Sequence, residues 1–554
     1  MDKKAFLLSA LAASGAGFAA MRFWLPAGLK KLESFAQSKK FWVPLCGVFL
    51  AGYLALQICS AVYPGYLELI EPHVASVSFV FLRGAPLYHA LDSPQRYSLF
   101  YGPMAYLPYT LALRVMGANV LSLKLVVLIA NLLLLGLLWK SYRLLLDAWH
   151  TLLTVAVVIA YWLLSGDYVF QVRGDTLIIL CVALGLFAVL RSPLWVSALL
   201  LALGCGFAFD VKITAIFYFL PLFILCIRGH GWRRAAWALA GAVLFALVPF
   251  FLPRISAAGY LNWLHQASRQ PLSRTEVPRE LKLLVAVCAP LALLLWQSAR
   301  RSRNGLAIYL GKNRVFLVTL GGCLTAVAIS AAKIGAGPHH FMPFYPIVGY
   351  ACADLYRAMK GTTMAQSVGS RWNLIPLLWF WLALGLATQL ATGFSSTVST
   401  LLTSRPFAAS VISDLREVMR THPGKKIEMG YGQMNAQYKL TFFRPLLVFA
   451  GNPLTIDAVA LGDMQLSGVE MPQSTLEYLR ACRTQIWLIP KGDPPFAMVN
   501  IYSLIDPRAF PARQLFGDDF RRIFFQQFHK QGSSQHFDIW ECAAHSDRPP
   551  DSKD

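Results

Sequence analysis

Charged residues are scarce in this sequence, and acidic residues are scarcer than basic ones. Of the 554 residues only 14% are charged, whereas 56% are hydrophobic. Soluble globular chains carry roughly 25% charged residues, so this composition excludes an ordinary soluble domain. Several apolar runs reach the ~17–25 residues that a membrane-spanning helix needs. The chain is therefore predicted to be an α-helical polytopic membrane protein.

Cysteine motifs are also missing. The chain has ten cysteines but no Cys-x-x-Cys pair and no His/Cys spacing that is typical of a metal site. Eight of the ten lie in or beside apolar runs and are expected to be small buried hydrophobic residues. Cys482 and Cys542 lie in the polar tail instead, and they could pair if that tail lies outside the cytoplasm.

Eleven apolar segments are predicted to span the membrane. Their approximate ranges are residues 41–62, 120–139, 149–165, 175–190, 194–209, 212–228, 233–252, 281–299, 315–332, 338–357 and 374–393. Residues 5–21 (AFLLSALAASGAGFAAM) could be a weak signal-like segment or an extra span, and the sequence leaves this open.

Basic residues are unevenly distributed along the chain. Almost all of the net charge of +22 arises within residues 1–394, because residues 395–554 hold 17 basic against 16 acidic residues. Within the membrane part the basic residues gather in alternate loops, beginning with residues 22–40. This pattern follows the positive-inside rule, so no nucleic-acid partner is expected. It predicts a multi-pass cell-membrane protein with a cytoplasmic N-terminal segment, residues 1–40, and an extracytoplasmic tail, residues 395–554.

The few acidic residues of the membrane part show the opposite distribution. Eight of the twelve in residues 1–394 fall in predicted outer segments, and these are Glu68, Glu71, Asp92, Asp167, Asp175, Asp210, Glu276 and Glu280. A transporter would carry ionisable groups near the middle of the membrane instead. The distribution therefore indicates a site that faces the outer side.

Two long outer loops interrupt the membrane domain, residues 41–394, and a polar tail follows it. Loop 63–119 has apolar stretches broken by Gly and Pro, which are expected to form helices along the membrane interface; the second long loop is 253–281. In the tail, helical patterns (SVISDLREVMRTHPG, TLEYLRAC) alternate with strand patterns (KKIEMGYG, TQIWLIP, HFDIWECA). Residues 395–554 are therefore predicted to form a small α/β domain.

The stretch YPGYLELIEPHVASV, residues 63–77, places two acids directly after the first span. Glu68 and Glu71 are three residues apart, so on a helix they share one face. Beside tyrosines and apolar side chains, such a carboxylate could act as a general base or bind a cation. The alternative is an interfacial loop whose acids simply face water.

Three further outer segments carry polar groups. They contribute Asp167, Arg173 and Asp175 in one turn, Asp210 and Lys212 in the next, and Lys333, His339 and His340 in the third. Each set has a structural alternative: an ion pair across a turn, a lysine that extends to the interface, or histidines that cap a helix. All of the sets fall on one side, however, and this predicts a shared site with acids for proton or metal chemistry and cations for an anion.

The ordered set of motifs resembles the GT-C superfamily of membrane glycosyltransferases, which includes protein O-mannosyltransferases, aminoarabinose transferases and the bacterial RgtA/B/C/D-like group. The matching elements are, in order, the acidic position at Glu71 with Glu68 beside it, the segments RGAPLY and FYGPMAYLPY, a Gly-x-Asn element at Gly117, an Arg-x-Asp turn at Arg173, a Lys-x-Thr-Ala element at Lys212 and the turn from Lys333 to Pro346. The resemblance covers residues 41–395. Members often have two adjacent acids where this chain has Glu71-Pro72, which leaves donor identity and metal dependence open.

The resemblance implies a GT-C-like fold with an extracytoplasmic C-terminal α/β domain, and it implies a reaction. A hexosyl or pentosyl group would pass from a polyprenyl-phosphate donor to a glycolipid, polysaccharide or protein acceptor of the cell envelope, by inverting direct displacement. Glu71 would be the catalytic base, with Glu68 as a neighbour. Further roles would fall to phosphate-binding residues (Arg173, Lys212, Lys333, His339, His340) and to acids that orient the acceptor or hold a divalent cation (Asp167, Asp175). A transporter of lipid-linked sugar and a non-catalytic envelope scaffold are the alternatives.

Overall fold

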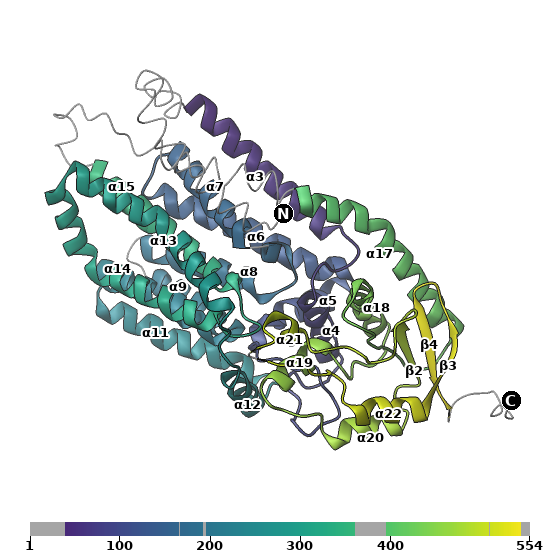
Figure 1. Cartoon of the computed structure of the whole chain (residues 1–554). Helices are drawn as coiled ribbons and strands as arrows, with labels where there is room; N and C mark the ends of the chain where they lie inside the picture. The colour runs from purple at the N-terminus through teal and green to yellow at the C-terminus, as the bar shows by residue number, and fades with distance from the viewer. Residues whose placement is uncertain (1–38, 166, 192–194, 361–394, 509, 544–554) are drawn as a thin grey trace.

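The structure is a computed structural model that describes residues 39–165, 167–191, 195–360, 395–508 and 510–543. A bundle of long helices carries a smaller mixed domain at one end, here called the domain end of the bundle (Figure 1). The bundle helices are α3 (Lys39–Ala61), α6 (Val120–Arg143), α7 (Ala148–Ser165), α8 (Gly174–Leu190), α9 (Trp195–Val211), α10 (Ile216–His230), α11 (Trp232–Leu247), α13 (Glu276–Arg301), α14 (Arg303–Ala331) and α15 (Tyr345–Lys360).

These helices have the length and composition of membrane spans. In the described part of the chain, six helical segments are long and apolar enough to cross a membrane, and α7, α8 and α9 are shorter apolar helices. Ten of the eleven predicted spans coincide with bundle helices. The eleventh, 374–393, and the segment 5–21 lie outside the described residues. The protein is thus an α-helical polytopic membrane protein, as its composition predicted.

Local sequence explains where several helices begin and end. Asn119 caps α6 by accepting a hydrogen bond from the Ser122 amide at 2.9 Å, and two basic residues in the last turn of α6 complement the helix dipole. Ser302 caps α14 in the same way, directly after α13 ends. Gly231, with φ +85°, separates α10 from α11 in a conformation that favours glycine.

The first long loop contains the short helices that its sequence predicted, and the second contains a helix that was not predicted. Loop 63–119 forms α4 (Ile70–Leu82), the 3-10 turn η1 (Pro103–Ala105) and α5 (Leu107–Met116). The second loop, which follows the 3-10 turn η4 (Val248–Phe251), forms α12 (Ala257–Ser268). Figure 1 shows α4 and α5 at the domain end of the bundle, beside α18 and α19. These helices therefore stand between the bundle and the C-terminal domain.

The C-terminal domain contains a four-stranded sheet in the order β1-β2-β4-β3. β1 (Ile427–Met429) and β2 (Ile486–Pro490) are parallel, and β4 (Phe537–Cys542) is antiparallel to both β2 and β3 (Phe528–Ser533). Its helices are α17 (Ser395–Thr421), α18 (Arg444–Phe449), α19 (Ala458–Leu466), α20 (Gln473–Arg480), α21 (Ile501–Ile505) and α22 (Asp518–Gln527), with the turn η8 (Ala436–Phe443). Strands β1, β2 and β4 and helices α17 and α20 were predicted. β3 was not, because FHKQGS is apolar only at its first residue.

Direct hydrogen bonds hold the C-terminal domain against the bundle. Arg96 of the first loop forms a parallel bridge with Ile456, since the Arg96 amide donates to Thr455 O at 2.6 Å and its carbonyl accepts from the Asp457 amide at 3.0 Å. In the second loop, the Ser273 hydroxyl donates to the Asp506 carboxylate at 2.6 Å. Both long loops are therefore fastened to the same domain.

A buried ion network strengthens this contact. Asp457 caps α19 by accepting from two amides of its first turn, and its other oxygen, Oδ2, pairs with Arg444. The same oxygen lies 3.2 Å from Nδ1 of His73 on α4, and both side chains are fully buried. His73 Nε2 in turn lies 3.2 Å from the Tyr106 hydroxyl. Asp457 thus joins α4 of the first loop to α19 of the C-terminal domain.

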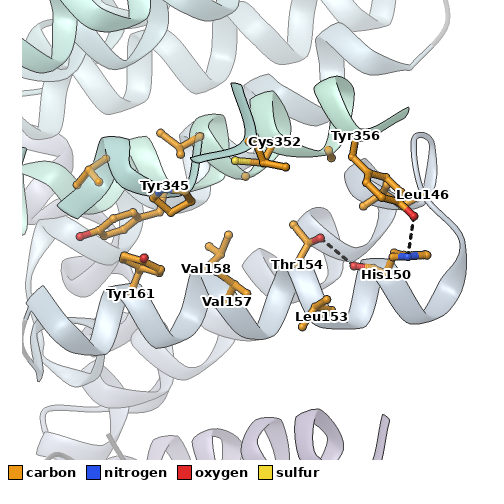
Figure 2. A pocket seen from close by; sticks show the side chains of 16 residues that line it. Leu146, His150, Leu153, Thr154, Val157, Val158, Tyr161, Tyr345, Cys352 and Tyr356 are labelled. Atoms are coloured by element: carbon orange, nitrogen blue, oxygen red, sulfur yellow. Dashed lines mark hydrogen bonds between the residues drawn. The ribbon is translucent and has the colours of Figure 1, made fainter. Parts of the chain in front are cut away.

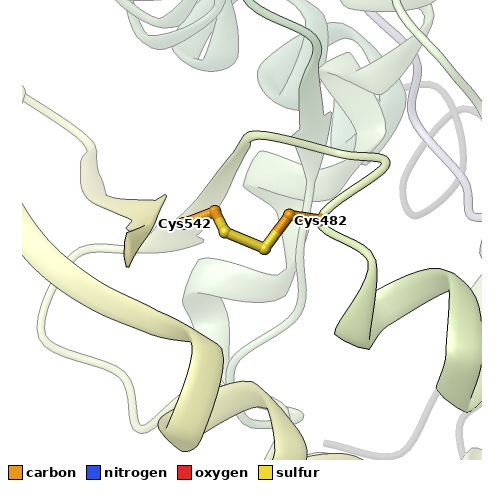
Figure 3. Close-up of a disulfide and its surroundings, with 2 residues drawn as sticks. All are labelled: Cys482 and Cys542. Atoms are coloured by element: carbon orange, nitrogen blue, oxygen red, sulfur yellow. A yellow bond between two sulfur atoms is a disulfide. The ribbon is translucent and has the colours of Figure 1, made fainter. Parts of the chain in front are cut away.

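A disulfide closes the C-terminal domain. Cys482 after α20 is bonded to Cys542 at the end of β4, 60 residues later, with a Cα–Cα distance of 6.1 Å (Figure 3). The pairing that the sequence left open is therefore present.

Replacing Cys482 and Cys542 together by serine is expected to lower stability by about 2–5 kcal/mol, because the crosslink restricts the unfolded chain. Thermal unfolding of the purified protein, with and without reductant, measures the loss. Cys59→Ser, at an exposed unpaired cysteine, is the matched control. Equal melting temperatures for the double variant and the wild type would contradict the expectation.

Candidate active site

Four charged side chains from three separate segments meet at the domain end of the bundle. They are Glu68, Arg173, Asp175 and Lys212, and they are called the charged cluster below. Asp175 accepts from Arg173 Nε at 2.9 Å through Oδ2 and from Lys212 Nζ at 2.6 Å through Oδ1. Arg173 Nη1 also reaches Glu68 Oε2 at 3.3 Å. Two acids face two bases, so the charges balance, as buried charges require.

Two close backbone approaches bring these segments together. Arg173 is extended and precedes α8, which begins at Gly174. A Cβ on Gly174 would lie 2.4 Å from a Val211 methyl carbon, and a Cβ on Gly102 would lie 1.9 Å from the Asp210 carbonyl oxygen. Glycine at both positions lets the turn before α8 and the loop before η1 contact the end of α9, directly before the lysine of the cluster.

Aromatic rings cover both cations of the cluster. Tyr168 lies over the Arg173 guanidinium at 4.7 Å, and Tyr101 lies over the Lys212 ammonium at 5.3 Å. Such contacts stabilise a cation by roughly 0.5–2 kcal/mol each, more where water is excluded. The rings therefore help to keep both positive charges in place at a buried position.

The two glutamates of the first loop have different surroundings. Glu71 is 1% exposed, and its two oxygens accept from the Leu67 amide at 2.7 Å and the Val172 amide at 2.9 Å. The Glu68 side chain is 24% exposed; Oε2 accepts from the Ile70 amide at 2.8 Å and faces Arg173. Glu71 thus ties the first loop to the turn before α8, whereas Glu68 belongs to the charged cluster.

Burial dominates the electrostatics of these groups. Burial raises the pKa of Glu68 above its ordinary value, although Arg173 opposes the shift. Burial alone would lower the pKa of Arg173, but Asp175 and Glu68 outweigh it and the pKa is raised, so the guanidinium stays charged. The cluster therefore combines a permanent cation with a carboxylate that binds protons more readily than an ordinary glutamate.

The predicted histidines lie beside the cluster. His339 and His340 belong to η5 (Pro338–Phe344), with their rings 4.6 Å apart, and the His339 ring is 5.0 Å from that of Tyr168. Lys212 and Asp175 both act electrostatically on the two imidazoles. Neither Nδ1 atom has a hydrogen-bond partner within the described residues. Two buried polar atoms thus remain available beside the cluster.

Lys333 makes no hydrogen bond or ion pair with the four residues of the charged cluster. Its ammonium donates to the carbonyls of Ala267 and Ser268 at 3.4 Å, at the end of α12, which favours a helix-capping role. The side chain of Asp167, at the start of η2 (Asp167–Phe170), lies outside what the structure describes. Its predicted role stays a prediction.

The described residues contain no group of three or more His, Cys, Asp or Glu side chains arranged to hold a metal ion. Asp175 already receives a hydrogen bond from a cation on each oxygen. Metal dependence therefore stays as open as the sequence left it.

Lys124 is a buried charge that the sequence interpretation did not select. It lies in α6, 2% exposed, and donates to the carbonyls of Ser60 and Tyr63 at 3.0 and 3.1 Å. Its ammonium also lies 4.9 Å from the centre of the Tyr63 ring. The signal was present, because a lysine inside an apolar span is unusual and marks a functional or structural site.

The C-terminal domain contributes a further carboxylate near the site. Asp463 of α19 accepts from the Tyr502 hydroxyl at 2.6 Å and from Gln270 of the second loop at 3.4 Å. Burial raises the pKa of Asp463 to about 7, although the hydrogen bond from Tyr502 acts to lower it. Its charge acts on Tyr101, the ring over Lys212. No sequence motif marks Asp463, since only folding brings it near residues 101 and 270.

A narrow apolar pocket lies between α7, α13 and α15 (Figure 2). His150 and Tyr356, hydrogen-bonded at 3.0 Å, lie at one end, and Tyr161 and Tyr345 at the other. A helix rises roughly 16 Å over the residues from Tyr345 to Tyr356. The open volume is only about 90 Å³, so the pocket suits a thin apolar chain. Its tyrosine end adjoins η5, and hence the histidines beside the charged cluster.

Replacing Asp175 by alanine is expected to destabilise the protein by roughly 3–5 kcal/mol, because Arg173 and Lys212 would lose their shared carboxylate while still buried. Asp175→Asn, which keeps the shape and one acceptor oxygen, is expected to lose less. Thermal unfolding in detergent measures both, and Glu477→Ala, at an exposed acid of α20, gives the baseline. A loss at Asp175→Ala no larger than at Glu477→Ala would contradict the structural role.

The sequence matches no protein-family model and no curated protein. Solved structures do match, and two of them are structures of ArnT. ArnT from Cupriavidus metallidurans bound to undecaprenyl phosphate is 14% identical with a TM-score of 0.54, and the match covers 92% of this chain and 99% of that chain. ArnT from the same organism in the apo state is 13% identical with a TM-score of 0.54, and the match covers 90% of this chain and 98% of that chain. ArnT is an aminoarabinose transferase of the GT-C family. At this identity the likeness concerns the fold: this chain has a GT-C-like fold, as its motifs predicted.

Proposed function

We propose that the protein is an integral membrane glycosyltransferase that moves a sugar from a polyprenyl-phosphate donor to a cell-envelope acceptor. The observation that carries the proposal is the charged cluster, in which two cations and two carboxylates meet at one end of a GT-C-like bundle. The similar ArnT structure is bound to undecaprenyl phosphate, which supports a lipid partner of this class.

The reaction is proposed to take place outside the cytoplasm. Basic residues gather in the loops opposite the domain end, which favours a cytoplasmic N-terminus and an extracytoplasmic C-terminal domain. The Cys482–Cys542 disulfide lies in that domain, and disulfides persist in oxidising compartments. A lipid-linked donor is the suitable substrate there, because its prenyl chain keeps the activated sugar at the membrane surface.

Arg173 and Lys212 are proposed to bind the donor phosphate. The guanidinium offers a planar set of donors that matches phosphate oxygens, and the ammonium uses only one of its three N–H donors on Asp175. Asp175 keeps both cations in place before the donor binds. As the phosphate leaves, its growing negative charge is stabilised by charges that need no rearrangement. His339 and His340 stand beside this position and are proposed to donate hydrogen bonds to it.

Glu68 is proposed as the catalytic base in preference to Glu71. Glu71 has both oxygens on backbone amides, whereas Glu68 is partly exposed and has a raised pKa. A base works best when its pKa lies near the working pH. Glu71 then acts as a positioning residue, because it ties the first loop to the turn that carries Arg173.

The proposed step is a direct displacement. The acceptor hydroxyl oxygen attacks the anomeric carbon while Glu68 takes the hydroxyl proton, and the bond from that carbon to the phosphate oxygen breaks. Polyprenyl phosphate leaves with the bonding electron pair, beside Arg173 and Lys212, and the configuration at the anomeric carbon inverts. Asp463 and Tyr502 of the C-terminal domain are proposed to orient the acceptor hydroxyls. A glycolipid, a polysaccharide or a protein could supply that hydroxyl.

The apolar pocket of Figure 2 is proposed to take part of the prenyl chain. Its tyrosine end adjoins η5, so a chain within it would leave the phosphate near the histidines and the charged cluster. The lining is mostly apolar, with polar side-chain atoms only on His150, Thr154 and three tyrosines. This composition favours a hydrocarbon chain.

Glu68→Gln is expected to lower the transfer rate 10²–10⁴-fold, which is the usual contribution of a general base. Arg173→Ala is also expected to lower the transfer rate, because the leaving phosphate loses a stabilising cation. Transfer is measured in vitro with a panel of polyprenyl-phosphate sugars and an envelope-lipid acceptor. Because the base must be deprotonated, the wild-type rate is expected to rise with pH through a pKa above ~4.3, the ordinary glutamate value. Glu68→Gln is expected to remove that limb of the profile.

Glu71→Gln is expected to lower the melting temperature and to reduce the transfer rate less than Glu68→Gln does. Glu477→Gln, at an exposed acid of α20, is expected to change neither the melting temperature nor the rate. Full loss of transfer in Glu71→Gln with normal transfer in Glu68→Gln would return the role of base to Glu71. Wild-type rates in Glu68→Gln, Glu71→Gln and Arg173→Ala, all folded, would reject the site.

Ala353→Trp, which fills the apolar pocket, is expected to raise KM at least about tenfold for an undecaprenyl-phosphate donor and to leave KM for a farnesyl-phosphate donor nearly unchanged. The shorter chain does not need the far end of the pocket. Leu239→Trp, on an exposed apolar position of α11, is the control. Equal changes in KM for both donors would show that the prenyl chain lies elsewhere.

A further inference from the structure

A second cavity lies at the membrane boundary, apart from the charged cluster. It has a volume of about 540 Å³ and is enclosed by the end of α3, the start of α6, and helices α17 and α18. The candidate spans end at Ala61 in α3 and begin at Val120 in α6, and both residues line the cavity. Its depth in the membrane therefore matches the boundary between hydrocarbon chains and headgroups.

The lining of the cavity is apolar apart from a few groups. It includes Val62, Leu121, Ile412, Leu446 and Phe449. Val62 and Leu121 are 53% and 47% exposed, which is unfavourable in water and favourable against hydrocarbon. The mouth of the cavity thus continues into a surface that suits lipid chains.

The neighbouring helix α5 extends this apolar surface. Leu111, Val115 and Met116 are 61%, 74% and 43% exposed, and Met116 is two residues before Ala118 of the lining. An interfacial helix places such residues among acyl chains. The cavity therefore opens beside the membrane, where a lipid can enter from the bilayer.

Among the described residues that line the cavity, Arg416 is the single charged one. It is exposed on α17, and within the described residues no carboxylate lies in salt-bridge range of it. The adjacent Glu417 is paired with Arg420 instead, at 2.6 Å. The guanidinium is therefore available to a phosphate at the rim, for which its donor geometry is suited.

The described residues of the lining also include no carboxylate. A zwitterionic phospholipid would bring an ammonium group to a site that has only a cation, whereas an anionic phospholipid would bring its charge to Arg416 alone. Charge complementarity therefore favours the anionic lipid.

We propose that this cavity binds an anionic glycerophospholipid from the adjacent leaflet, with the phosphodiester at Arg416 and an acyl chain between α3, α6 and α18. The bound lipid joins α17, which leads into the C-terminal domain, to the two spans that precede the charged cluster. Tyr63 links the cavity to the buried Lys124, because it lines the cavity and its ring lies 4.9 Å from the Lys124 ammonium.

The test uses the delipidated full-length protein, with phosphatidylglycerol, phosphatidylcholine or inorganic phosphate added. Native mass spectrometry counts the bound lipid, and thermal unfolding measures the shift in melting temperature. Phosphatidylglycerol is expected to bind at least about tenfold more tightly than phosphatidylcholine and to raise the melting temperature, and inorganic phosphate is expected to have no effect.

Two variants locate the binding. Arg416→Gln is expected to remove the preference for phosphatidylglycerol, and Ala450→Trp, at an exposed lining position, to reduce binding of both lipids. Arg405→Gln removes the same charge from α17 outside the lining and is expected to behave as the wild type. Unchanged lipid preference in Arg416→Gln, or an equal loss in Arg405→Gln, would overturn the proposal, as would stabilisation by inorganic phosphate alone.

Discussion

The shared carboxylate of Asp175 is the interaction on which the site depends. It holds Arg173 and Lys212 from two different segments, each within 3 Å. Buried cations without a partner are unfavourable by several kcal/mol, so the turn before α8 and the end of α9 must stay together. Glu68 and the rings of Tyr101 and Tyr168 then complete a charged and largely buried position. Such a position can stabilise charge that develops on a phosphate without rearrangement.

The C-terminal domain is part of this arrangement. Asp457 joins α4 to α19, and Arg96 and Ser273 connect both long loops to the same domain. Through these contacts Asp463 and Tyr502 come to lie near Tyr101. Loops alone are the most mobile parts of a protein, and here a folded domain restrains them. This explains how residues on loops can form a site with fixed distances.

Much of the fold was accessible from the sequence, and the reasons are physical. Apolar runs of about 20 residues can only be spans or buried helices, so ten of the eleven predicted spans coincide with described helices. Strands with alternating or continuous apolar residues, such as TQIWLIP, were predicted, whereas FHKQGS was not. Its pairing with β4 stabilises it as an edge strand, and pairing between distant segments leaves no local signal. Lys124 was missed although an ionisable residue within an apolar span is a strong signal.

Sequence alone determined the residue types of the site and the end of the bundle on which they lie, because charged groups avoid the hydrocarbon and gather in particular loops. Glu68, Arg173, Asp175, Lys212 and the two histidines were all selected in this way. Tertiary structure decided their contacts. In the folded chain Lys333 donates to carbonyls of α12, and Glu71 accepts from backbone amides. Glu68 pairs with Arg173, and Asp463 of the C-terminal domain lies near the site. Spacing along a chain cannot distinguish two acids three residues apart, because the difference lies in partners that only folding brings within hydrogen-bond distance.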